Sequence, residues 1–128
     1  MQDYGYHIIR ADAPPTSNYV EGTVIEHVHL RSQLVIYADI TRAGATAVIL
    51  KVEFSDTGND GDWFQETIEN IDPSTGTITH IVAERRFEET FKGAIPIPIK
   101  HKYIKISTKG IGTLTNTTVA INAITGIV

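Results

Sequence analysis

The chain has 128 residues, the length of a single domain, and its 15 acidic and 11 basic residues give a net charge of -4. The acidic balance argues against a nucleic-acid or membrane-surface binder, because such surfaces concentrate Lys and Arg. The lack of Cys excludes disulfides, thiolate metal sites and cysteine nucleophiles.

Residues branched at Cβ dominate the composition, with 19 Ile, 9 Val and 16 Thr against 4 Leu and 1 Met. Branching at Cβ restricts χ1, which disfavours helix and suits the pleated surface of a sheet. The sequence therefore predicts an all-β fold.

The first segment, residues 1–18, has no sustained hydrophobic period and contains two adjacent prolines. We expect an extended N-terminal arm there, followed by one domain over residues 19–128. Its apolar side chains suggest that the arm packs on this domain or on a neighbouring subunit, although a partly ordered terminus is the alternative. The candidate contact residues of the arm are Tyr4, Tyr6, Ile8 and Ile9.

Short apolar runs separated by turn signals follow the arm. Residues 19–30 alternate in the manner of a half-buried strand, and residues 34–38 are apolar at nearly every position, which predicts burial on both faces. The clearest period of two covers residues 46–54, where apolar side chains point one way and Lys and Glu the other. We expect this segment to be a central strand.

A polar turn at residues 55–61 precedes an extended segment over residues 62–69. The sequence Asp-Pro-Ser-Thr-Gly at residues 72–76 combines a preset φ with a residue that tolerates positive φ, so it marks a hairpin turn. The return strand is expected at residues 77–87.

Prolines alternate with isoleucines in residues 94–99. Because Pro has no backbone N–H, this segment should be a sheet edge or a crossing between sheets. Its candidate contact residues are Ile95, Ile97 and Ile99. With two more strands expected at residues 102–108 and 117–128, about eight strands predict a single-domain antiparallel β-sandwich of the jelly-roll kind.

His27 and His29 have metal-ligand chemistry, because side chains two apart on a strand share a face. With Gly22 before them, they are similar to the metal-binding motif of cupins. The carboxylate that this motif needs after the second His is missing, since Ser32, Gln33 and Leu34 occupy the stretch. We therefore interpret both as solvent-facing or interfacial His and predict no metal.

The polar turn offers oxygens that could bind calcium, from Asp56, Asn59, Asp60 and Asp62. Aligned on the EF-hand pattern from Asp56, however, the turn places Gly58 at a ligand position and Thr67 where the bidentate Glu belongs. A hairpin turn whose polar side chains support local backbone hydrogen bonds is the favoured interpretation.

Trp63 could stack on a sugar, in an aromatic platform with Phe64, Tyr37 and Tyr103. A single Trp is more often a core or interface anchor, and this is the favoured interpretation.

The mixed charges of residues 84–89 suggest a solvated or intersubunit strand edge. No catalytic triad, carboxylate pair or phosphate loop is recognisable, so we expect a protein that is not an enzyme and has no cofactor.

Three parts of the chain resemble small β-sandwich structural proteins of tailed bacteriophage virions. They are residues 52–55 with 62–66 across the acidic turn, residues 102–107, and residues 120–127. The resemblance covers residues 20–128 and leaves the arm outside. It implies a non-enzymatic virion component assembled in the host cytoplasm: a capsid decoration or cement protein, or a neck or tail subunit.

Such a protein would have other virion proteins as partners, namely major capsid, neck or tail proteins. We also expect a homo-oligomer, for which a trimer is one form, and neither nucleic acid nor membrane as a partner. The alternative functions are a carbohydrate-binding β-sandwich module that uses Trp63, and a cupin-like metal enzyme that uses His27 and His29.

Overall fold

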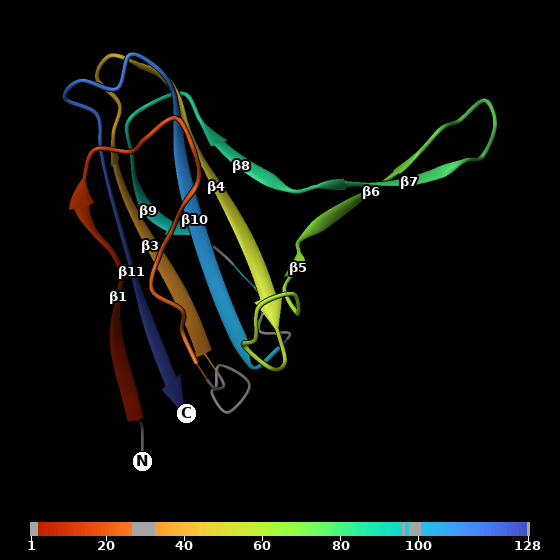
Figure 1. Ribbon diagram of the computed structural model, residues 1–128, viewed down its shortest axis with the longest axis horizontal. Helices are drawn as coiled ribbons and strands as arrows, with labels where there is room; N and C mark the ends of the chain where they lie inside the picture. Colours follow the sequence, from red (N-terminus) through yellow and green to blue (C-terminus); the bar gives the residue numbers. More distant parts are fainter. Residues whose placement is uncertain (1–2, 27–32, 96, 98–100, 128) are drawn as a thin grey trace.

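The computed structural model describes residues 3–26, 33–95, 97 and 101–127. Their regular secondary structure is entirely β, arranged as two packed sheets and a two-stranded hairpin that projects from them (Figure 1). The predicted all-β sandwich is confirmed. In this part of the chain, no helix is long and apolar enough to cross a lipid bilayer.

Each sheet is antiparallel throughout. The first sheet has the order β1 (Asp3–Ala13), β11 (Thr118–Ile127), β3 (Gln33–Thr41) and β9 (Phe91–Ile95). The second sheet has the order β2 (Val20–Glu21), β10 (Tyr103–Gly112) and β4 (Ala45–Ser55), with β8 (Glu84–Phe87) and β5 (Phe64–Gln65) both paired to β4. The hairpin consists of β6 (Thr67–Ile71) and β7 (Ile78–Val82).

The strand pairing is that of a jelly roll. Without β5, β6 and β7, the remaining strands pair from the two ends of the chain inward. The first pairs with the last, β1 with β11, and then β2 pairs with β10, β3 with β9 and β4 with β8. This nesting of hairpins across two sheets defines the jelly roll, which the sequence had predicted. Strands β5 to β7 are therefore an insertion between two paired strands of the sandwich.

The described residues form eleven strands where the sequence predicted about eight. One addition is β1, and the other two arise because the segments expected at residues 62–69 and 77–87 each divide in two. They divide at Glu66 and Ala83, where the Glu66 N–H donates to the Val52 carbonyl (3.1 Å) and the Ala83 N–H to the Glu66 carbonyl (2.8 Å). At these two residues the hairpin leaves the sandwich.

Strand β1 occupies the segment that we expected to be an extended arm packed on this domain or on a neighbouring subunit. It pairs with β11 from Asp3 opposite Ile127 to Ala13 opposite Val119, and Ile9 is only 3% exposed. The register shifts on both sides of Arg10, and such irregularities interrupt the alternation by which a strand is recognised in sequence. Residues 3–13 are thus an integral edge strand.

The core lies between the inner faces of the two sheets. Strand β4 is central as predicted, because β10 pairs with one of its edges and β8 and β5 with the other. Its inward side chains and those of β10 meet those of β3 and β11 in a single cluster, whose deeply buried large members include Ile36, Ile40, Ile121, Leu50, Val52 and Ile106. Burial on both faces of residues 34–38 was wrong, because Tyr37 points outward and is 42% exposed.

Candidate functional site

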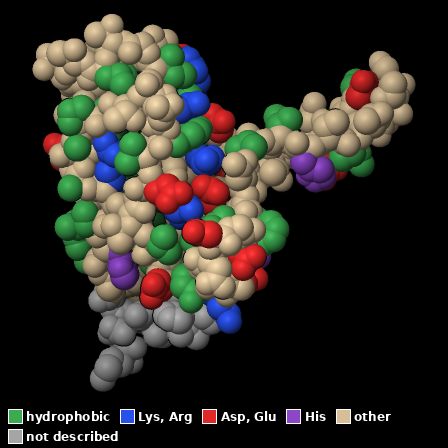
Figure 2. All heavy atoms as spheres, in the orientation of Figure 1, with side chains coloured by type: hydrophobic (Ala, Val, Ile, Leu, Met, Phe, Trp, Pro, Cys, Tyr) green, Lys and Arg blue, Asp and Glu red, His purple; other side chains and the backbone are tan. Residues whose placement is uncertain are grey.

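The β6–β7 hairpin projects well beyond the sandwich (Figures 1 and 2). Its five cross-strand pairs run from Thr67 opposite Val82 to Ile71 opposite Ile78, and every residue of both strands is exposed. The predicted turn closes it: the Asp72 Oδ1 accepts from the Ser74 N–H at 2.8 Å, and Gly76 has a φ of 72°.

The hairpin has apolar side chains on both faces. Side chains alternate along each strand, so paired residues share a face. We call one the uncharged face, which consists of Ile68, Asn70, Thr79 and Ile81. The other is the charged face, which consists of Thr67, Glu69, Ile71, Ile78, His80 and Val82.

The four isoleucines of the hairpin are between 52% and 57% exposed. An isolated two-stranded hairpin is marginally stable in water, and exposed apolar clusters of this kind mark surfaces that contact another molecule. The hairpin is therefore the leading candidate for a functional surface.

The root of the hairpin is held by a half-buried ion pair. The Arg85 Nη1 lies 2.6 Å from the Glu66 Oε1, and the Nη2 lies 3.4 Å from the Oε2, so the guanidinium donates a hydrogen bond to each carboxylate oxygen. Beside this pair is an open hollow of about 400 Å³, lined by Glu66, Thr67, Ile68, Ala83, Glu84 and Arg85. The hairpin thus starts from a fixed base that has room for a side chain of another molecule.

A second apolar surface lies on the outer face of the first sheet. We call it the outer patch, and it consists of Tyr6, Ile8, Val35, Tyr37, Ala94 and Ile124, which follow two rows of cross-strand neighbours around Asn122. Tyr6 is 64% exposed and Ile8 57%. The outer face of an antiparallel sheet usually meets water with polar residues, so this patch is another candidate contact surface.

The outer face of the second sheet is different, because its long side chains are paired. The Lys105 Nζ lies 3.1 Å from the Glu21 Oε1, and the Lys51 Nζ lies 3.7 Å from the Glu53 Oε1. The ammonium groups of Lys51 and Lys109 lie over the ring of Tyr19, and burial, with a contribution from a neighbouring carboxylate, raises the pKa of Tyr19 to about 12. Charged side chains gather over the body of the sandwich in Figure 2.

The residues predicted as subunit contacts separate into two groups. Tyr6 and Ile8 are exposed on the outer patch, whereas Ile9, Ile95 and Ile97 are at most 5% exposed and belong to the core. Ile9 lies on the opposite side of its strand from Ile8, so the two cannot share a surface. The side chain of Tyr4 and all of Ile99 lie outside the described residues.

The pair His27 and His29 also lies outside the described residues. Within the described part of the chain, no group of three or more His, Cys, Asp or Glu side chains is arranged to hold a metal ion.

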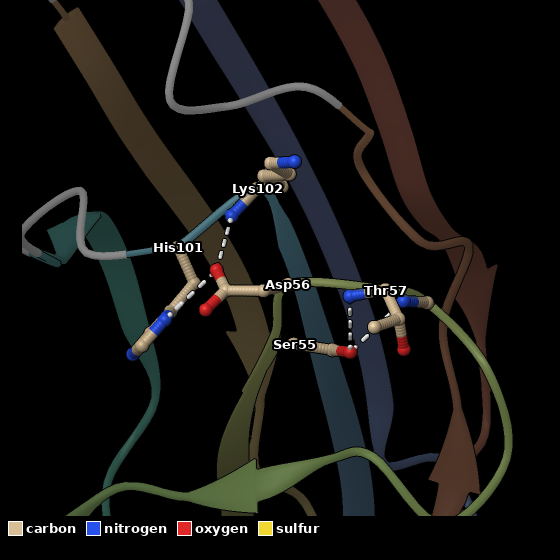
Figure 3. Close-up of polar contacts among 6 residues, drawn as sticks. Ser55, Asp56, Thr57, His101 and Lys102 are labelled. Carbon is tan, nitrogen blue, oxygen red and sulfur yellow. Dashed lines mark hydrogen bonds and ion pairs between the residues drawn. The ribbon is translucent and has the colours of Figure 1, made fainter.

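The polar side chains of the acidic turn bind one another and the backbone (Figure 3). The Ser55 Oγ accepts from the N–H groups of Thr57 (3.2 Å) and Gly58 (2.9 Å), and the Thr57 hydroxyl donates to the Asp62 Oδ2 at 2.6 Å. The interpretation as a turn with local hydrogen bonds is confirmed for these residues.

Asp56 links the acidic turn to the start of β10. Its Oδ1 lies 3.1 Å from the His101 Nδ1 and accepts from the Lys102 N–H at 3.4 Å (Figure 3). The hydrogen bond with His101, helped by that from Lys102, lowers the pKa of Asp56. A depressed carboxyl pKa means that the ionised form stabilises the fold.

We expect the contribution of Asp56 to the free energy of unfolding to depend on pH. Its contribution is complete above the unfolded-state pKa of about 3.9 and is lost as the pH falls through the lower, folded-state value. Asp56→Asn should therefore have a lower urea midpoint than the wild type near pH 6, and the two midpoints should converge in strong acid. A midpoint difference that stays constant down to about pH 2 would contradict this role.

The four aromatic residues do not form one platform. Tyr37 lies on the outer face of the first sheet, whereas Phe64 and Tyr103 belong to strands of the second. The Lys105 Nζ lies 4.3 Å from the centre of the Trp63 ring and covers one face of the indole. Trp63 thus packs on its own sheet.

The mixed-charge run forms part of a sheet edge, as predicted. Residues 84–87 are strand β8, and the Arg86 Nε lies 2.7 Å from the Glu88 Oε1 in an exposed ion pair.

No family model and no curated protein matches the sequence. Among solved structures, the chain is similar to the crystal structure of the SPBc2 prophage-derived protein YomS, with a TM-score of 0.47 and 12% sequence identity. The similarity covers 98% of this chain and 95% of the YomS chain.

Proposed function

We propose that this protein is a non-enzymatic structural subunit of a phage virion, a capsid decoration or cement protein that binds the particle through its hairpin. The observation that carries this proposal is the projecting hairpin, which has exposed isoleucines on both faces and an ion pair at its root. The jelly-roll sandwich supplies the scaffold that holds it away from the core.

The size of the surface suggests how such a subunit would bind. Complete burial of an exposed Ile stabilises by about 1.5–3 kcal/mol, so four half-exposed isoleucines provide roughly 3–6 kcal/mol before the entropy of association is subtracted. Association costs at least about 4 kcal/mol, so at most about 2 kcal/mol remains, and a single hairpin would bind with a Kd weaker than about 1 mM. Many copies on a repetitive particle, or several hairpins in one oligomer, would raise the avidity.

The charged face is the part of the hairpin that fits a capsid surface. Its isoleucines, Ile71 and Ile78, are nearest the tip, and its ionisable side chains, Glu69 and His80, can pair with polar groups at an interface rim. The carbohydrate-binding alternative lacks its aromatic platform, since Tyr37 lies on the other sheet, and Lys105 covers one face of the Trp63 ring.

Binding to capsids assembled without this protein tests the proposal. The wild-type chain should co-sediment with them, and Ile71→Asp combined with Ile78→Asp should weaken binding at least about tenfold, because two apolar contacts become buried charges. Val20→Asp is the matched control, since Val20 is an exposed apolar residue on the second sheet. Failure of the wild type to bind, or equal binding by the double variant, would reject the proposal.

Cryo-microscopy of the source particle locates the subunit. We expect its density at repeated positions of the capsid lattice. Density confined to the neck or tail would replace the decoration role with the neck or tail role.

A further inference from the structure

The two apolar surfaces of the chain face different directions. In Figure 1 the first sheet forms one side of the sandwich, with β1 at its edge, and the hairpin projects from the opposite side. A chain cannot bring these two surfaces together by itself, because its own sandwich lies between them (Figure 1). A second copy can present one surface to the other.

The dimensions of the two surfaces agree. Five residue pairs at about 3.4 Å each make the hairpin about 17 Å long, and three strand spacings of about 4.8 Å make the first sheet about 14 Å wide from β1 to β9. The outer patch extends over all four strands of that sheet. The hairpin can therefore lie across the patch and cover it.

The charges of the side chains indicate which face of the hairpin can pack on the outer patch. None of the side chains of the outer patch is charged, and the same holds for the uncharged face with Ile68 and Ile81. The charged face would bury Glu69 against apolar groups without a partner, which is costly. The amide of Asn122, in the middle of the patch, can instead meet Asn70 and Thr79 of the uncharged face.

The hollow at the root supplies a place for an anchor. It lies beside Ile68 and has a volume of about 400 Å³, with the Glu66–Arg85 pair in its lining. Tyr6 is the most exposed aromatic residue of the patch, at 64%. A tyrosine can bury its ring in such a hollow and direct its hydroxyl to a charged pair.

We propose that the uncharged face of the hairpin packs on the outer patch of a second copy of this chain. The inference rests on the proposed function, in that it names one of the partners of the same hairpin. Because the contact joins two different surfaces, it is heterologous, and its repetition gives a ring where the rotation closes and an open filament where it does not. The charged face of each hairpin then remains available to the particle.

The small area of one contact favours a closed ring over two chains joined by a single contact. Only one face of the sixteen-residue hairpin from Thr67 to Val82 takes part, whereas each side of a standard stable interface has about 20–30 residues. One contact of this size is weak. In a closed ring every subunit makes two such contacts, so the ring is the expected assembly.

Mass measurement by light scattering, without particles, tests the contact. The hairpin variant is Ile68→Asp with Ile81→Asp, and the patch variant is Ile8→Asp with Tyr37→Asp; all four residues are exposed. The wild type and the control Val20→Asp should have the mass of a ring, and each double variant should have the mass of one chain. Where an Asp variant is misfolded by circular dichroism, Thr at the same two positions replaces it.

Mixing the two variants is the decisive step. The intact hairpin of the patch variant can bind the intact patch of the hairpin variant through one weak contact, so a mixture at about millimolar concentration should contain more dimer than either variant alone at the same concentration. A mixture with no more dimer than either variant alone, a wild type that is monomeric, or a patch variant that still assembles would overturn the inference. The last outcome would mean that hairpins pair with each other.

The mass and the co-sedimentation results separate the two proposals. A monomeric wild type that binds capsids overturns this inference and leaves the proposed function. A ring that does not bind capsids overturns the proposed function and leaves the contact between copies.

Discussion

Replacing Ile9 with Ala is expected to lower the free energy of unfolding by about 2–5 kcal/mol, whereas Ala at the adjacent Ile8 should lower it by less than about 1 kcal/mol. Ile9 is 3% exposed and belongs to the core cluster, so its truncation leaves a cavity between the sheets. Ile8 is 57% exposed on the opposite face of the same strand. The pair compares two isoleucines that differ mainly in direction.

Urea unfolding of both variants, followed by circular dichroism in dilute protein where association is negligible, measures the difference. Equal and small losses would mean that residues 3–13 do not contribute to the core, as a detached arm would not. For the same reason, removal of residues 1–18 should prevent stable folding, since it uncovers the edge of β11 and deletes Ile9.

The sequence predicted the strands of the jelly roll correctly where apolar and polar residues alternate. Within residues 46–54, apolar and polar side chains alternate at every step from Leu50 to Phe54, and this segment became part of the central strand β4. Strand β1 was missed because its register shifts beside Arg10 break the period, and because Pro14 and Pro15 follow it closely.

The contact surfaces were harder to predict, because a short strand does not reveal which of its faces points inward. Tyr6, Ile8 and Ile9 are all apolar, and only the pairing with β11 shows that the third belongs to the core. The hairpin did carry a signal. Apolar residues of both parities flank the turn at residues 72–76, which a strand with one buried face does not require.

Gly22 lies directly after β2, at a corner where the chain contacts both sheets. We expect Gly22→Ala to lower the free energy of unfolding by at least about 1–3 kcal/mol. A Cβ at this position would lie 2.5 Å from the Ile9 Cγ2 and 2.9 Å from the carbonyl oxygens of both Ile9 and Ile106. Those carbonyls belong to β1 and β10, so the new methyl group would push on both sheets at once.

The backbone at this corner cannot shift without breaking hydrogen bonds. The Gly22 N–H donates to the Ile106 carbonyl at 2.9 Å, and the next N–H, of Thr23, donates to the Ile9 carbonyl at 2.8 Å. These two bonds tie the segment after β2 to one sheet and then to the other. Relief of the clash would leave buried polar groups unpaired, which costs about 1–3 kcal/mol for each group.

Thermal and urea unfolding of Gly22→Ala should be compared with Gly93→Ala, where the nearest atom to the new Cβ is the far end of the Phe91 ring at 3.1 Å. That ring can rotate away, so the Gly93 variant should lose less stability. Ile9→Ala removes the side-chain clash and leaves both carbonyl clashes, so Gly22→Ala should cost as much stability in the Ile9→Ala background as it does in the wild type. A much smaller cost in that background would show that side-chain crowding, and not the joined backbones, requires glycine at this corner.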